Sequence, residues 1–356
     1  MEGGSLLATG SSSCIFRPNI PCRDSNDKQS NKKVSKIVHG SKAQRYYDKE
    51  KLITKLIKRI KGYRKWCIIY DNFCQPPDYS NIFKYEPKIL ECKDEYYSSI
   101  FDETSKMMVS RYGGITLEDY FISLLENDNK IEVKMFDLMK KMKQLFVGLK
   151  EIYHNKLVHL DIKYNNIVLD GRSFKYIDFG LSGEAHDLTH FKNRSLSEFN
   201  TKRMYIWYPP EYLYGSIDES YKNDELSKFN SQKFRKHYSD GLNIHRMFNV
   251  NLNNHIRELL SSNKTMPDSD YQQMISMIDV YSLGIMIPFL FNEYNLTKYI
   301  KSSRFLKDLF KLFAKMCETN HKKRINPDEC LKEYNQIMNK YSHLSNKGKK
   351  TKKKKI

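Results

Sequence analysis

Residues 159–178 read HLDIKYNNIVLDGRSFKYID, and Phe179-Gly180 follow directly. Two acids and one amide stand here at fixed spacings: Asn166 follows Asp161 by five residues, and Asp178 follows Asn166 by twelve. The short apolar runs beside them are typical of buried strands, so we expect these polar groups at strand ends. The stretch therefore predicts a site built from oxygen-bearing side chains.

The side chains of this stretch have the chemistry of phosphoryl transfer. Asn166 and Asp178 offer the oxygen ligands that hold Mg²⁺ beside phosphates. Asp161 can accept a proton from a hydroxyl, and the ammonium of Lys163 can neutralise a transferring phosphate. We therefore take Asp161 and Lys163 as candidate catalytic residues, and Asn166 and Asp178 as candidate metal ligands.

The pattern HxDxKxxN followed by DFG resembles the catalytic and metal-binding loops of the eukaryotic-type Ser/Thr protein kinases. The resemblance implies an α+β, bilobal protein kinase-like fold, with a small β-rich N-lobe and a larger helical C-lobe. It implies ATP and Mg²⁺ as cofactors, with Mn²⁺ as an alternative, and protein substrates that are phosphorylated on serine or threonine.

Length and charge agree with a globular enzyme of two lobes. The chain has 356 residues, 40% hydrophobic content and a formal net charge of +19. Part of this charge is the lysine run at residues 347–355, which suits an acidic or nucleic-acid partner. The alternative is solubility together with an AT-rich coding bias, since Lys, Asn, Ile and Tyr are all abundant.

The seven cysteines form no CxxC pair and no zinc-type cluster. We therefore expect reduced thiols and an intracellular, reducing compartment. No apolar run approaches 18 residues, so we expect no membrane span. The N-terminus shows no signal-peptide pattern, and Glu2 excludes N-myristoylation.

Residues 6–16, LLATGSSSCIF, read as strand, turn and strand. Protein kinases place G-x-G-x-x-G-x-V at this point, so that backbone N–H groups approach the ATP phosphates. With Ile15 at the valine position, Ala8, Gly10 and Ser13 take the three glycine positions, and only Gly10 is glycine. A Ser-rich surface turn is the alternative interpretation.

The next predicted strand, residues 34–38, carries a lysine on its apolar face. Such a lysine is costly unless a partner pairs with it. The resemblance implies that Lys36 holds the α- and β-phosphates, and that Ile15, Val34 and Val168 line the adenine site. The alternative is an edge-strand lysine that discourages sheet pairing.

Residues 43–61 have the periodicity of an amphipathic helix, with an apolar stripe formed by Ile53, Leu56, Ile57 and Ile60. The resemblance implies a glutamate on this helix that pairs with Lys36. Glu50 fits this role, Asp48 is its rival, and a surface Glu–Lys pair is the alternative.

Two further strands are expected in this lobe, at residues 66–70 and 107–110. The second leads into residues 111–114, RYGG, which resemble the hinge between the lobes. The gatekeeper is then either Val109 or Ser110, and the sequence leaves both open.

The C-terminal part begins with Thr116, which can cap a helix together with Asp119. Residues 135–154 predict a strong amphipathic helix that leads into the opening stretch. Its apolar stripe consists of Leu138, Met142, Leu145, Phe146, Leu149 and Ile152.

Three later segments match kinase motifs in the right order. Residues 204–211 match the Ala-Pro-Glu segment, residues 274–284 match Asp-Val-Trp-Ser-Leu-Gly, and Arg324 matches the late arginine. The resemblance implies a buried ion pair between Glu211 and Arg324. It also implies that Asp279, within the second segment, binds the backbone of the catalytic loop.

Leu160 stands where many kinases have an arginine that pairs with a phosphate on the activation loop. We therefore expect an enzyme that does not require phosphorylation there. His159 is expected to pack behind the catalytic loop. The hydroxyl residues of that loop that could still be modified are Ser182, Thr189, Ser195, Ser197 and Thr201.

The predicted organisation is an N-lobe at residues 1–110, a C-lobe at 111–342 and a basic, disordered tail at 343–356. An insertion at about 214–270 interrupts the C-lobe, with one helix suggested near residues 255–260. We interpret it as a tolerated surface insertion, with a docking or substrate element as the alternative.

The composition, the degenerate Gly turn and the YGG hinge resemble kinases of large nucleocytoplasmic DNA viruses, which implies host cytoplasm or virion as the location. Three other classes compete with an active protein kinase: a pseudokinase scaffold, a small-molecule phosphotransferase, and a nucleic-acid-binding protein that acts through the tail.

Overall fold

The computed structural model divides the chain into two compact units. The first unit comprises Met1–Gly114 with Ile177–Gly180, and the second comprises Ile115–Tyr176 with Leu181–Ile356. The residues that the structure describes are 5–10, 13–23, 25, 28–41, 43–78, 104–125, 130–200, 206–214, 239–248, 250, 252–261 and 266–345. Ser11, Ser12, Thr201, much of the predicted insertion and the tail from residue 346 onward lie outside them.

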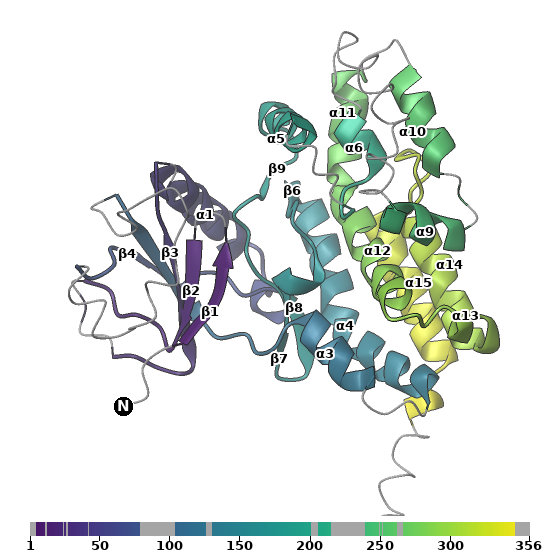
Figure 1. Ribbon diagram of the computed structural model, residues 1–356, viewed down its shortest axis with the longest axis horizontal. Coiled ribbons are helices and arrows are strands. Elements are labelled where there is room, and N and C mark those ends of the chain that lie inside the picture. The colour runs from purple at the N-terminus through teal and green to yellow at the C-terminus, as the bar shows by residue number, and fades with distance from the viewer. Residues whose placement is uncertain are drawn as a thin grey trace, which may run out of the picture. The chain divides into compact units, whose positions relative to one another are not determined.

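The first unit is built on a five-stranded antiparallel sheet with the order β1-β2-β3-β5-β4 (Figure 1). The helix α1, Ala43–Lys58, follows β3, and the 3₁₀ turn η1 covers Tyr63–Lys65. The strands are β1 Ser5–Gly10, β2 Ser13–Arg17, β3 Lys33–Val38, β4 Asn72–Cys74 and β5 Lys106–Arg111. The predicted strand at residues 66–70 is wrong, because the strand of this region is the short β4 that follows it.

Strand alternation gives this sheet two different faces. One face is a closed apolar core, whose buried members are Cys14, Phe16, Ile20, Cys22, Ile37, Met107 and Val109. On the other face a smaller buried cluster joins Val38 and Met108 of the sheet to Ala43 of α1 and to Tyr70. Lys36 lies on this second face, because it pairs with Met108 and stands two residues before Val38 on β3.

The second unit is mostly helical, and its short strands pair as β6 with β9 and β7 with β8. Its elements are α3 Leu117–Leu125, α4 Ile131–His154, β6 Leu157–Val158, η3 Tyr164–Asn166, β7 Ile167–Asp170, β8 Ser173–Tyr176, β9 Gly183–Glu184, α5 Leu188–Asn200, α6 Pro210–Tyr214, α9 Ser239–Met247, α10 Leu252–Ser261, α11 Asp268–Ser276, α12 Ile278–Glu293, α13 Lys298–Ser302, α14 Arg304–Met316 and α15 Pro327–Lys340.

Local sequence signals account for the start of this unit. Thr116 donates to the Asp119 carboxylate (2.7 Å) and accepts from the Asp119 N–H (3.1 Å), which closes the predicted cap of α3. The whole apolar stripe predicted for α4 is buried, and so is nearly all of α12. These two helices therefore form the interior of the unit, against which the shorter helices pack.

The described part of the predicted insertion belongs to this interior. Ile244 and His245 of α9 are fully buried, as are Leu252 and Ile256 of α10. The two α10 residues pack in one apolar cluster with Tyr212 of α6. The apolar faces of α9 and α10 therefore contribute to the core of the unit.

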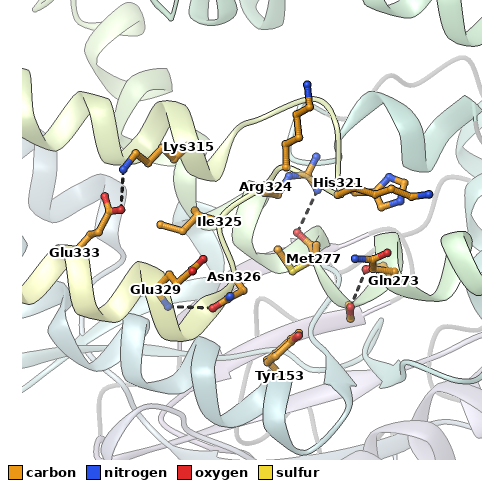
Figure 2. A pocket seen from close by; sticks show the side chains of 13 residues that line it. Tyr153, Gln273, Met277, Lys315, His321, Arg324, Ile325, Asn326, Glu329 and Glu333 are labelled. Atoms are coloured by element: carbon orange, nitrogen blue, oxygen red, sulfur yellow. Dashed lines mark hydrogen bonds and ion pairs between the residues drawn. The ribbon is translucent and has the colours of Figure 1, made fainter.

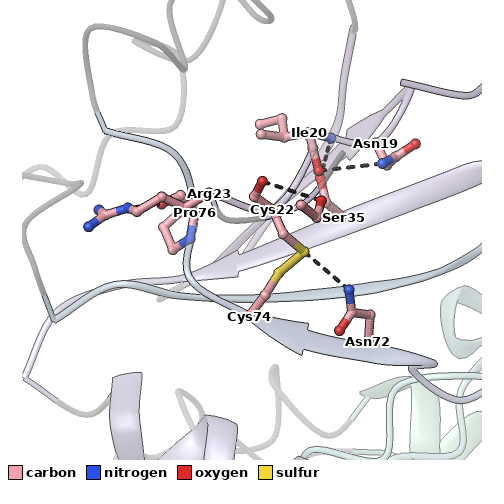
Figure 3. The surroundings of a disulfide bond; sticks show 9 residues. Asn19, Ile20, Cys22, Arg23, Ser35, Asn72, Cys74 and Pro76 are labelled. Atoms are coloured by element: carbon pink, nitrogen blue, oxygen red, sulfur yellow. Dashed lines mark hydrogen bonds between the residues drawn. A yellow bond between two sulfur atoms is a disulfide. The ribbon is translucent and has the colours of Figure 1, made fainter. Parts of the chain in front are cut away.

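The expectation that all cysteines are reduced is wrong for Cys22 and Cys74, which form a disulfide (Figure 3). The two residues are 52 positions apart in sequence, with Cα atoms 5.9 Å apart. The segment after β2 and the end of β4 meet here, a juxtaposition that spacing alone could not reveal. Cys14 is also disulfide-bonded, whereas Cys67, Cys317 and Cys330 are buried free thiols.

Among the described residues, no single helix has the length and apolar composition needed to cross a membrane. The helices α11 and α12 meet that test only as a pair bent by 43°.

Candidate active site

Apart from Glu50 on α1, the predicted nucleotide-binding residues of the first unit share one face of its sheet. Residues directly paired across antiparallel strands point to the same side. On this face Ile15 and Val34 stay partly exposed, whereas the opposite face is a closed core. Accessible apolar side chains beside a lysine suit a ligand with a flat base and phosphates. The pairs that establish the face are Ala8 with Ile15, Gly10 with Ser13, Ile15 with Lys36, and Val34 with Ser110.

The same register separates the two gatekeeper candidates. Ser110 pairs with Val34 and therefore lies on the face that carries Lys36. Val109 pairs with Ser35 and belongs to the apolar core of the opposite face. Of the two, Ser110 is the residue placed to meet a nucleotide on this sheet.

Lys36 forms an ion pair with Asp178, with 2.8 Å between Nζ and Oδ1. Both residues belong to the first unit, although 142 positions separate them. Burial alone would lower the pKa of Lys36, but the carboxylate of Asp178, followed by Tyr70 and Glu50, raises it above its ordinary value. The lysine is therefore charged at neutral pH, as a phosphate-binding group must be.

Glu50 is the buried acid of α1, with 2% exposure, whereas Asp48 is exposed and accepts a hydrogen bond from Gln44. The Glu50 carboxylate accepts from the Phe179 N–H. Burial and then the Asp178 charge raise the pKa of Glu50 to about 8, against the opposing effect of Lys36. Among the described residues no ion pair joins Lys36 and Glu50, so the predicted direct pairing is replaced by the Lys36–Asp178 contact.

Gly180 fits this arrangement because of its size. A Cβ at this position would lie 3.2 Å from Oε2 of Glu50 and 3.4 Å from Oδ1 of Asp178. A side chain here would therefore crowd the Glu50 carboxylate and touch that of Asp178 at ordinary van der Waals distance.

In the second unit Asp161, Lys163 and Asn166 converge within one loop. The Asn166 amide donates to Oδ2 of Asp161 at 2.7 Å and to its backbone carbonyl at 3.0 Å. The Lys163 ammonium lies 3.1 Å from the same Oδ2. The Asp161 carboxylate is thus oriented by two donors on one oxygen, which is how a proton acceptor is held in place.

The backbone of this loop is held by a buried acid, as the resemblance implied. Asp279 of α12 accepts from the N–H groups of His159 (2.6 Å) and Leu160 (3.0 Å). Burial raises the pKa of Asp279 to about 6, and these two hydrogen bonds oppose the rise. His159 is fully buried and its carbonyl accepts from Ser182 (3.0 Å), so it has the packing role predicted for it.

The predicted metal ligands have donor atoms that fit Mg²⁺. Asn166 uses its NH₂ group on Asp161, which directs its amide oxygen the other way. That oxygen and the Asp178 carboxylate are hard donors, the type that Mg²⁺ prefers. Among the described residues no cluster of three or more His, Cys, Asp or Glu side chains is arranged to hold a metal ion. Asn166 belongs to the second unit and Asp178 to the first.

Val168, the last predicted nucleotide-binding residue, lies on β7 in the second unit. It pairs with Lys175 and forms an isolated bridge with Thr116. Its side chain is buried, with 6% exposure.

A pocket of about 550 Å³ in the second unit contains none of the predicted site residues. Figure 2 shows its charged side chains pairing locally: Lys315 meets Glu333, and Arg324 donates to the carbonyl of Met277. Lys322 is paired with Asp270 (2.8 Å). These pairings leave the pocket wall largely neutralised, and we assign no ligand to it.

Tyr70 is the site residue that sequence reasoning missed. It is buried at 8% exposure and is among the groups that raise the pKa of Lys36. Its only sequence signal was a hydroxyl-bearing aromatic at the end of an apolar run. Its proximity to Lys36 arises from the packing of the unit.

Comparison with known proteins agrees with this geometry. Residues 29–227, more than half of the chain, match the family model for the protein kinase domain. The chain is 28% identical over 102 residues to the CTD kinase subunit alpha of Saccharomyces cerevisiae, a match that covers 28% of this chain and 18% of that protein. It is 34% identical over 98 residues to cyclin-dependent kinase 9 of Danio rerio, which covers 27% of this chain and 25% of that protein.

The chain is also 47% identical over 47 residues to the serine/threonine-protein kinase prpf4B of Dictyostelium discoideum. This shorter match covers 13% of this chain and 6% of that protein. The chain thus matches a quarter or less of the length of each of these relatives. With a matching family model across more than half its length, and with the loop and ion pairs described above, the chain belongs to the protein kinase domain family.

Proposed function

We propose that this chain is a protein serine/threonine kinase that transfers the γ-phosphoryl group of ATP to a hydroxyl of a protein substrate. The observation that carries the proposal is the orientation of Asp161, whose Oδ2 receives both Asn166 and Lys163. The charged Lys36 on a partly open apolar sheet face supports ATP as the phosphate donor.

Each residue has a defined task in this proposal. Lys36 binds the α- and β-phosphates, and Ile15 and Val34 cover the base. Asp161 accepts the hydroxyl proton as the substrate oxygen bonds to the γ-phosphorus and the bond to the leaving ADP oxygen breaks. Lys163 neutralises charge on the transferring group. Asn166 and Asp178 are the residues that would hold Mg²⁺, and the ion would neutralise phosphate charge when bound.

The test is transfer of labelled phosphate from ATP, with Mg²⁺ or Mn²⁺, to acidic and basic generic protein substrates. Phosphoamino-acid analysis then identifies the acceptor. We expect phosphoserine or phosphothreonine from the wild type, and a rate reduced by roughly 10²–10⁴ for Asp161→Asn, because general-base catalysis contributes on that order. Wild-type activity in Asp161→Asn would overturn the assigned mechanism.

A pseudokinase scaffold is the competing function, and phosphoryl transfer separates it from the enzyme. An enzyme binds ATP and transfers phosphate, and Asp178→Ala loses transfer through loss of a metal ligand. A scaffold would bind partners with no transfer from the wild type under any metal condition. The Lys36–Asp178 ion pair and the ordered Asp161 loop favour the enzyme.

We also propose that the lysine run at residues 347–355, which lies outside the described residues, binds acidic or nucleic-acid partners. Removing residues 346–356 should weaken salt-sensitive binding to nucleic acid and leave phosphoryl transfer to a generic substrate unchanged. Unaltered nucleic-acid binding after truncation would contradict the role of the tail.

A further inference from the structure

The helix α1 and the turn η1 that follows it carry a run of exposed positive charge. One side of α1 is buried at Ile53 and Ile57. The other side carries Lys51, Lys55 and Lys58, which stand at i, i+4 and i+7 and therefore share one face. The exposed acids of residues 43–71 are Asp48 and Asp71. The exposed cations of the same segment are Arg45, Lys51, Lys55, Lys58, Arg59, Lys61, Arg64 and Lys65.

Most of these cations have no acidic partner. Among the described residues, the members of this run that form no ion pair are Lys55, Lys58, Arg59, Lys61 and Lys65. In the second unit, by contrast, exposed lysines meet acids from other helices. Lys192 pairs with Asp268, and Lys315 pairs with Glu333, each at 2.7 Å. The positive charge of α1 and η1 is therefore left unbalanced by its surroundings.

The helix dipole accounts for only part of this charge. Cations are favourable in the last turn of α1, where Lys55 and Lys58 stand. Arg45 stands in the first turn, which contains no acid and where a cation is unfavourable. Lys51 and Lys55, four positions apart, also repel each other. The pattern costs the helix stability, and an anionic ligand on this face would offset that cost.

The backbone beneath these charges is well anchored. Helical hydrogen bonding continues past the end of α1, because the Ile60 N–H donates to the carbonyl of Ile57 at 2.9 Å. In η1 the N–H of Trp66 donates to the carbonyl of Tyr63 at 3.0 Å, and the Trp66 side chain is buried at 1% exposure. The cations therefore stand on an ordered backbone. We call the set Lys51, Lys55, Lys58, Arg59 and Lys61 the α1 basic surface.

The composition of the α1 basic surface favours a phosphate backbone over other anionic partners. Protein interfaces have apolar centres and are depleted of lysine, whereas the large apolar side chain exposed on α1 is Leu52 alone, at 54%. A membrane-bound helix inserts its apolar face, but that face of α1 is buried within the first unit. Nucleic-acid interfaces are polar and strongly positive, and lysine contacts phosphate as a point charge.

We propose that the α1 basic surface binds the phosphate backbone of a nucleic acid. Its lysines contact phosphates and read no base sequence. This binding is separate from the role proposed for the lysine run at residues 347–355. It is also independent of phosphoryl transfer, so it stands or falls apart from the proposed kinase activity.

The test compares two full-length variants in which exposed lysines become glutamine, a residue with a helix propensity close to that of lysine. The surface variant changes Lys51, Lys55, Lys58 and Lys61. The matched control changes exposed lysines of the second unit, namely Lys298, Lys301, Lys307 and Lys332. Both variants lose the same net charge and keep the tail. The affinity for a fluorescent DNA duplex of arbitrary sequence is measured at several salt concentrations, together with the melting temperature.

For the surface variant, we expect the plot of log affinity against log salt concentration to become less steep by roughly 3–4, because each lost phosphate contact removes about 0.9 from the slope. The control variant should keep the wild-type slope to within about one contact. Both variants should melt close to the wild-type temperature, since the changed side chains are exposed.

A second measurement uses the wild type and does not depend on the folding of a variant. Lysines are labelled with an amine-reactive reagent in the presence and absence of the duplex, and the labelled peptides are identified by mass spectrometry. Labelling of Lys51, Lys55 and Lys58 should fall when the duplex is present. Labelling of Lys298 and Lys301 should stay the same.

Three outcomes would overturn the proposal. The first is a salt slope of the surface variant equal to that of the wild type, or equal losses of slope in the two variants, which would attribute binding to net charge alone. The second is unchanged labelling of the α1 lysines by the duplex. The third is protection of these lysines by polyglutamate or by phosphatidylserine vesicles but not by the duplex, which would assign the surface to an acidic protein or to a membrane.

Discussion

Arg324 donates a hydrogen bond to the carboxylate of Glu211 inside the second unit, across 113 positions of sequence. The two side chains are 0% and 2% exposed. Arg324 also donates to the carbonyls of Met277 and Glu318. One guanidinium thus joins α6, the start of α12 and the loop after α14.

Replacing Arg324 by alanine should lower the free energy of unfolding by about 3–5 kcal/mol, because Glu211 would be left buried without its charge partner. Chemical denaturation measures the change. Lys340→Ala removes a cation from the pair with Asp308, in which the lysine is 63% exposed, and should cost about 1 kcal/mol or less. Equal losses in the two variants would contradict the special role of the buried pair.

Leu160 is fully buried in one apolar cluster with Phe191 of α5 and Tyr212 of α6. Apolar packing therefore orders this segment, at the position where many kinases place a phosphate-binding arginine. We expect phosphatase treatment of the purified protein to leave its activity unchanged, and alanine at the exposed Thr189 or Ser197 to do the same. Loss of activity on dephosphorylation would contradict this expectation.

Leu160→Arg should not create a phosphate clamp. It would place a charge in the apolar cluster and destabilise the unit by several kcal/mol. Leu160→Ala, which only leaves a cavity, should cost about 2–5 kcal/mol. Thermal or denaturant unfolding measures both, and an arginine variant as stable as the wild type would show that the site opens to solvent.

His245 of α9 gives the second unit a specific sensitivity to acid. Its Nε2 lies 2.9 Å from the Tyr281 hydroxyl, and burial, followed by the charges of His255 and Arg324, lowers its pKa from 6.5 to about 3. The unfolded chain therefore binds a proton at this residue below pH 6.5, whereas the folded chain does so only near pH 3. Stability from this residue is complete above pH 6.5 and is lost as the pH falls toward 3.

His245→Gln removes the titration and keeps a polar partner for Tyr281. Its free energy of unfolding should fall less steeply than that of the wild type between pH 6.5 and 3, as followed by denaturant titration at several pH values. Parallel curves for the wild type and His245→Gln would show that His245 does not titrate as described.

The disulfide between Cys22 and Cys74 should stabilise the first unit by about 2–4 kcal/mol, since it closes a loop of 52 residues in the unfolded chain. A reducing agent should lower the unfolding temperature of the wild type more than that of the Cys22→Ser/Cys74→Ser variant. Reduction with an identical effect on both proteins would mean that this bridge contributes nothing.

Much of the fold followed from local patterns. The stripe of α4, the cap formed by Thr116 and the strand that carries Lys36 were all predicted, because each depends on residues close together in sequence. The prediction of a strand at residues 66–70 was wrong, because a run of apolar residues can form a buried loop as well as a strand. The buried placement of His245 in α9 was not predicted, since its burial depends on the distant Tyr281.

The sequence by itself predicted the candidate site: the spacing of Asp161, Lys163, Asn166 and Asp178, together with a lysine, Lys36, on the apolar face of a predicted strand, resembles the pattern of the protein kinases. Only the tertiary structure decided which groups meet. It paired Lys36 with Asp178 rather than with Glu50, packed Tyr70 on the sheet face that carries Lys36, and joined Cys22 to Cys74. These contacts depend on sheet register and side-chain packing between distant segments, which no local pattern encodes.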